Sequence, residues 1–164
     1  MNMNPEKSNK AAAAPQNPLL AEWTGPYGGI PPFDKVRVED FKPALEQGMR
    51  ENLAEIDKIA DQTSAPTFDN TIAAIERTGR TLDRVSTIYN VWSTTMSTPE
   101  FRAVEGEMDE ALAAFGDKIT QNQALFKRIE TVYNSPAKKK LTTEQQRLTW
   151  RYYTNFVRAG AKLG

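Results

Sequence analysis

The stretch that decides the fold is residues 41–60, FKPALEQGMRENLAEIDKIA. Its apolar side chains recur every three or four positions, which is the spacing of one face of an α-helix. Pro43 lies early enough to occupy the first turn, where its missing N–H costs little. We predict a long amphipathic helix that begins near Val38, with this apolar stripe: Phe41, Leu45, Met49, Leu53, Ile56 and Ala60.

The helical period continues beyond this stretch. A second helix is expected to open near residues 67–70 and to run past Thr78. Gly79 either breaks that helix into two pieces or only weakens it. Its later apolar stripe is Leu82, Val85, Tyr89, Trp92 and Met96.

Three further helices are marked by their ends. A capping hydroxyl, a proline and an acid at residues 98–100 predict a start. A short helix should end before residues 134–136, which contain a proline. Thr142 with Gln145 fits a capping box for a last helix that runs to about Ala159.

No segment alternates with a period of two, so no sheet is expected. We predict an all-α fold: about five amphipathic helices in an antiparallel array behind an irregular N-terminal arm rich in Pro and Gly. Residues 1–16 are expected to form a disordered tail, with a degenerate export signal as the alternative. Residues 17–37 should form an extended arm held by Trp23, Tyr27 and Phe33, and residues 38–164 the helical segment.

Composition excludes several classes of function. The 164 residues carry 21 Lys and Arg against 21 Asp and Glu, with no His and no Cys. Zero net charge argues against a nucleic-acid partner, and no apolar stretch approaches the length that crosses a membrane. A Ser-His-Asp triad, a Cys-His dyad and a His-bearing zinc site cannot form from these residues.

Charge is unevenly distributed along the chain. Acids outnumber bases in residues 39–69, and bases outnumber acids in residues 121–164. Neighbouring helices with complementary solvated faces would explain this, and so would a basic edge that meets acidic ligands or another domain.

The last helix carries apolar side chains on two sides. Leu148, Tyr152 and Phe156 cluster on one side, and Trp150, Tyr153 and Val157 lie about 130° away. Such a helix is normally packed on two sides. Either the N-terminal arm covers the second side, or the natural protein continues and covers it. In the second case, the chain alone could self-associate through this helix.

Several segments follow the order of a known family. They include PPFD at 31–34, FKPALEQGM at 41–49, PTFDNTIAAIERTG at 66–79, an N-x-x-LF-x-R pattern at 122–128 and FVRAGAKL at 156–163. The chain resembles the N-terminal part of bacterial peptidyl-dipeptidases and oligopeptidase A, which are thimet-oligopeptidase-like (M3) zinc metallopeptidases. The resemblance covers about residues 17–163.

The resemblance implies a helical wall or lid segment of a protease that releases C-terminal dipeptides from short peptides. In the family, zinc is held by an HExxH helix, which this chain lacks. We therefore expect no catalytic, cofactor-binding or metal-binding residue here, and we expect zinc only in a full-length parent. Glu46, Glu76 and Glu105 are interpreted as surface acids.

The expected partner is the remainder of the peptidase chain, with short peptides as the parent's substrates. The expected location is the cytoplasm, or the periplasm if an export signal is missing. The alternative function is a stand-alone helical binding or scaffold module.

Overall fold

The computed structural model describes residues 17–21, 23 and 33–163. In that part of the chain every regular element is a helix, so the predicted all-α fold is confirmed. The α-helices are α1 (Val38–Ala60), the three-residue α2 (Ala74–Glu76), α3 (Arg80–Thr95), α4 (Pro99–Thr120), α5 (Gln123–Asn134) and α6 (Thr143–Arg158). A π-helical turn η1 (Phe68–Ala73) precedes α2, and a 3-10 helix η2 (Pro136–Lys140) joins α5 to α6.

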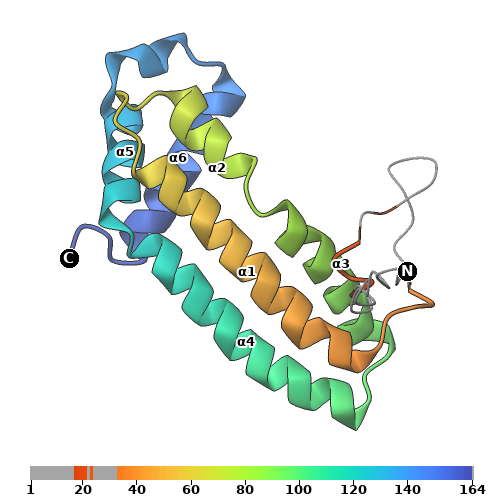
Figure 1. The fold of residues 1–164 in the computed structure, drawn as a ribbon. Helices are drawn as coiled ribbons and strands as arrows, with labels where there is room; N and C mark the ends of the chain where they lie inside the picture. Colours follow the sequence, from red (N-terminus) through yellow and green to blue (C-terminus); the bar gives the residue numbers. More distant parts are fainter. Residues whose placement is uncertain (1–16, 22, 24–32, 164) are drawn as a thin grey trace, which may run out of the picture.

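The long helix α1 lies in the middle of the fold and contacts most of the other helices (Figure 1). Its first half packs against α3 and α4, and its C-terminal half packs against α5 and the η1–α2 segment. Two separate hydrophobic clusters result, one toward each end of α1. The apolar stripe predicted from residues 41–60 therefore serves both clusters.

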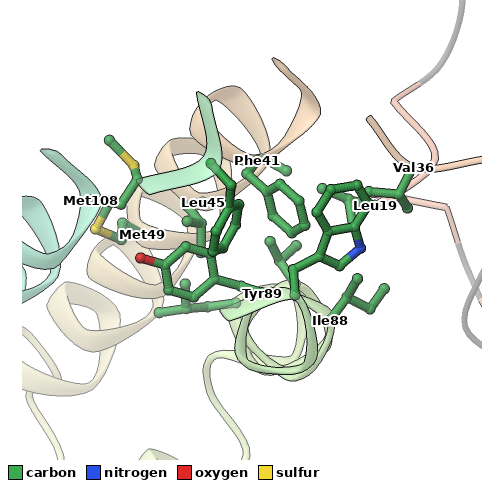
Figure 2. Close-up of a cluster of buried hydrophobic side chains, with 13 residues drawn as sticks. Leu19, Val36, Phe41, Leu45, Met49, Ile88, Tyr89 and Met108 are labelled. Carbon is green, nitrogen blue, oxygen red and sulfur yellow. The ribbon is translucent and has the colours of Figure 1, made fainter. Parts of the chain in front are cut away.

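The first cluster is built around aromatic rings (Figure 2). Phe41 of α1 meets Tyr89, Trp92 and Phe101 edge to face, with ring centroids 5.2–5.8 Å apart. Edge-to-face contacts of this kind add roughly 0.5–1.5 kcal/mol each beyond area burial. The cluster thus fixes the relative positions of α1, α3 and α4.

The second cluster joins elements that are distant in sequence. Ile56 and Ile59 of α1 pack with Ile72 of η1, Leu125 and Ile129 of α5, and Phe156 of α6. Phe126 stacks on Phe156 with their centroids 6.2 Å apart. This end of α1 is enclosed by α5 and α6.

Gly79 breaks the second predicted helix, which settles the two possibilities left open by the sequence. Its φ of 78° is left-handed, and an added Cβ would lie 2.8 Å from Nδ2 of Asn52 on α1. Its backbone N–H donates to Oε1 of Glu55 at 3.2 Å. A non-glycine residue here would be strained and crowded.

The helix ends follow the sequence signals. Thr98 accepts a hydrogen bond from the Phe101 N–H, and Thr142 and Gln145 form the predicted capping box. The helix α6 ends in a Schellman motif, in which Gly160 at φ 92° turns the chain and the Ala161 N–H donates to the Phe156 carbonyl.

The prediction that Pro43 occupies the first turn of α1 is wrong, because Pro43 is the sixth residue of this helix. The Glu39 carbonyl, which a residue-43 N–H would bond, lies on the exposed start of the helix.

The N-terminal segment contacts the first cluster. Leu19 and Val36 are buried there, and Trp23 is partly buried against the same residues. The expectation for Phe33 is wrong, because this side chain is 40% exposed. Tyr27 and the predicted tail at residues 1–16 lie outside the described residues.

Candidate functional site

Two of the family-like segments meet in space at a partly buried polar cluster. Residues 66–79 contribute Asn70, and residues 122–128 contribute Arg128, which is itself buried. The Arg128 Nη2 donates to the Asn70 Oδ1 at 3.1 Å. We call Gln62, Asn70 and Arg128 the polar hub.

Asn70 organises the start of η1. Its side-chain oxygen accepts the Thr67 N–H at 2.8 Å, and its own N–H donates to the Thr67 hydroxyl at 3.1 Å. Its side-chain nitrogen donates to the Ala65 carbonyl at 2.9 Å. The most specific family-like segment therefore builds a capping box that is tied to the preceding loop.

Arg128 connects this turn to the end of α1. Its Nη1 donates to the carbonyls of Gln62 and Ser64 at 3.3 and 2.9 Å. The Gln62 side chain closes the hub by donating to the Asn70 carbonyl at 2.8 Å. The hub thus holds the loop between α1 and η1 in one conformation.

In the polar hub, the charged guanidinium of Arg128 is held by hydrogen bonds to neutral oxygen acceptors. Arg128 is 6% exposed, and burial lowers the pKa of its guanidinium below the ordinary value. Both carbonyls that accept from its Nη1 belong to the loop that follows the C-terminal end of α1. Its Nε has no hydrogen-bond partner. This arrangement suits a positioning role and offers no proton-transfer group.

The sequence contains a signal for the burial of Arg128, although we predicted no role for this residue. The residue lies on the apolar stripe of α5, at helical spacing from Leu125 and Val132. A charged residue in such a stripe is buried with its α5 neighbours and needs hydrogen-bond acceptors. Only the tertiary structure shows that the acceptors come from the α1–η1 segment.

A groove of 360 Å³ lies beside the hub-held loop. One wall is formed by Pro66 and Thr67 and the first two residues of η1, and the other by the end of α5, η2 and the start of α6. Asp69 and Lys138 supply opposite charges to its lining, and Phe68, Val132 and Leu141 supply apolar surface.

The residues present do not fit the zinc ion that the family resemblance implies. The chain has no His and no Cys, and the described residues include no group of three or more acidic side chains that could hold a metal ion. Glu46 is half-buried at a groove between α1 and α4. Glu76 accepts a hydrogen bond from the Tyr152 hydroxyl, and Glu105 accepts one from Ser93.

The second apolar side of α6 is partly covered. Tyr153 stacks on Tyr133 of α5 with their centroids 4.1 Å apart, while Val157 packs against the second cluster. Trp150 is 52% exposed. The part of the arm that the structure describes packs on the first cluster instead, so the coverage of α6 by Leu19 or Trp23 is ruled out.

Two comparisons with known proteins bear on this geometry. No family model matches the chain. The chain is 33% identical over 147 residues to a dipeptidyl carboxypeptidase of Salmonella typhimurium and, equally, to one of Escherichia coli. The match covers 90% of this chain but only 22% and 21% of those two proteins, so the chain spans about a fifth of their length. The resemblance read from the sequence motifs is thereby confirmed.

Proposed function

We propose that this chain is a helical wall segment of a peptidase of the dipeptidyl carboxypeptidase kind, and that it carries no catalytic group of its own. The observation that carries this proposal is the 33% identity over 90% of the chain. A match over 147 of the 164 residues includes both motif segments of the polar hub. The segment would limit entry to the active site to short peptides, from which the whole enzyme releases C-terminal dipeptides.

The chemistry would then belong to the remainder of the parent chain. An M3-type enzyme would hold its zinc with two His and one Glu, and this chain offers neither His nor Cys. In the part of the chain that the structure describes, no helix is long and apolar enough to cross a membrane. We propose a cytoplasmic parent, and a periplasmic one if an export signal precedes it.

A stand-alone helical binding or scaffold module is the second candidate. It is favoured by the completeness of the two clusters, whose central side chains, such as Phe41 and Ile129, are fully buried by this chain alone. The gene separates the two candidates. A reading frame that continues to an HExxH helix supports the peptidase segment, and a stop codon after Gly164 supports the module.

A chimera tests the proposed function directly. The matched 147 residues of the Salmonella dipeptidyl carboxypeptidase would be replaced by this chain's matching residues. We expect the chimera to bind zinc and to release dipeptides from a short fluorogenic peptide, whereas an enzyme with the segment deleted should not. A chimera that folds and binds zinc but releases no dipeptide contradicts the proposal.

A further inference from the structure

The outer face of α6 combines an exposed tryptophan with arginines. Around the helix axis, Thr154, Arg147, Arg158 and Arg151 follow Trp150 in one direction, at about 40°, 60°, 80° and 100° from it. All three arginines are exposed, and Trp150 is 52% exposed. We call these five residues the α6 outer face. Tryptophan and arginine are the residue types that most often dominate binding energy at protein interfaces.

No ion pair among the described residues neutralises this face. The ion pairs among the described residues are Arg37 with Glu39 and Lys42 with Glu107, and neither involves α6. The sequence left open that the basic segment 121–164 pairs with the acids of residues 39–69. No ion pair in the described part of the chain joins these two segments. The other interpretation left open by the sequence, a basic edge that meets an acidic partner, gains support.

The opposite flank of Trp150 also carries positive charge. Tyr153 stacks on Tyr133, Lys138 lies 4.1 Å from the Tyr133 ring centroid, and Lys162 lies 5.3 Å from that of Tyr153. Cation–π contacts hold these amines in place without removing their charge. Lys138 and Lys162 therefore add positive charge around the Tyr133–Tyr153 stack.

Acidic residues are present at the margins. Glu144 lies in the first turn of α6, and Glu130 lies near Lys162. Glu76 and Glu144 line a hollow of 350 Å³ together with Arg147 and Arg151. Glu76 already accepts the Tyr152 hydroxyl, and none of these acids forms an ion pair with an α6 arginine.

We propose that the α6 outer face docks on an acidic surface of the catalytic part of the peptidase, with Trp150 as its main apolar contact. This inference rests on the proposed function, because about four-fifths of each relative lies outside the match and would supply that surface. Complementary charge fixes the register of such a contact, and a desolvated tryptophan supplies its affinity.

Other occupants fit the face less well. A symmetric contact between two copies would place arginine against arginine, because the same patch meets itself in a two-fold dimer. A nucleic acid is disfavoured because the chain has no net positive charge to attract phosphates. The acids of α1 and α4 would also repel it.

The chimera with the dipeptidyl carboxypeptidase tests the docking contact. Charge reversal by Arg147→Glu and Arg158→Glu should shorten its half-life of thermal inactivation or lower its kcat/KM by about tenfold. Trp150→Gln should act in the same direction. A matched control, Arg80→Glu with Arg102→Glu, changes net charge equally on α3 and α4 and should stay within about twofold. In the isolated chain, neither pair should shift the urea midpoint appreciably.

Several results would overturn the inference. These are equal losses in both charge-reversed chimeras, no loss in either, or a matching loss of stability in the isolated Arg147→Glu, Arg158→Glu chain. A dimer of the isolated chain that Arg147→Glu abolishes would assign the face to a second copy, and a salt-sensitive RNA complex would assign it to nucleic acid.

Failure of the proposed function is distinguishable from failure of the docking face. An unmodified chimera that folds without activity contradicts the proposed function. The acidic chemistry of the contact is then judged on the isolated chain with poly-L-glutamate as the probe. Saturable quenching of fluorescence that Trp150→Gln removes supports the face, and its absence refutes it.

Discussion

Gly48 of α1 and Leu82 of α3 meet at backbone contact. A Cβ added to Gly48 would lie 2.9 Å from the Leu82 Cα and 3.1 Å from its backbone nitrogen. No flexible side-chain end is available to move away at this point. The two helices therefore approach each other as closely as they do because residue 48 lacks a side chain.

Gly48→Ala should destabilise the chain. Because the added Cβ would meet backbone atoms, the overpacking cost should lie in the upper part of the usual range of about 1–3 kcal/mol and exceed the gain of roughly 1 kcal/mol in helix propensity. Gly116 of α4 provides the matched control, because its added Cβ would meet nothing within 4 Å. Gly116→Ala should stabilise by about 0.5–1 kcal/mol in urea unfolding. Equal effects of the two substitutions would contradict the close contact.

Arg128→Met should remove the polar hub. The substitution keeps a long side chain but removes the donor to the carbonyls of Gln62 and Ser64, at a total cost of about 1–3 kcal/mol. Lys127→Met, one residue away on the exposed face, should stay within about 0.5 kcal/mol. Amide hydrogen exchange of residues 61–71 should accelerate in the first variant only. Unchanged exchange there would argue against the hub as the support of this loop.

Trp150→Gln and Phe156→Ala probe opposite sides of α6. Phe156 is 4% exposed and packs in the second cluster, so its truncation should cost about 3–5 kcal/mol. Trp150 is half-exposed, and Trp150→Gln should cost less than about 1 kcal/mol while raising solubility. Urea unfolding and light scattering measure both effects. Comparable unfolding of the two variants would show that Trp150 is buried within the chain itself.

Stability should fall as pH rises above about 10, the ordinary pKa of tyrosine. Burial raises the pKa of Tyr89 and of Tyr152, and hydrogen bonds to Asp109 and Glu76 add to this effect. The unfolded chain then loses these protons at a lower pH than the folded chain, so ionisation favours unfolding. Tyr89→Phe and Tyr152→Phe should each flatten the decline of the urea midpoint between about pH 10 and 11, the first unit above that pKa. An unchanged slope in both variants would refute the linkage.

The purified chain should neither retain stoichiometric zinc nor cleave peptides. Without His or Cys, only carboxylates remain as ligands, and these suit hard cations better than zinc. Elemental analysis after dialysis and a fluorogenic dipeptide-release assay measure both properties. Chelator-sensitive cleavage with one zinc per chain would disprove the prediction.

The sequence by itself determined the helices and most of their ends. The apolar spacing of residues 41–60 and the caps at Thr98 and Thr142 act within a few residues along the chain, so they can be read without a fold. The absence of His and Cys likewise excluded whole classes of site in advance. Only the tertiary structure decided what depends on contacts between segments distant in sequence. Asn52 and Glu55 surround the left-handed turn at Gly79, and carbonyls over 60 residues away bind Arg128. The exposure of Phe33 and of Trp150 was decided in the same way, because burial depends on which neighbours the fold brings to a side chain and not on its own hydrophobicity.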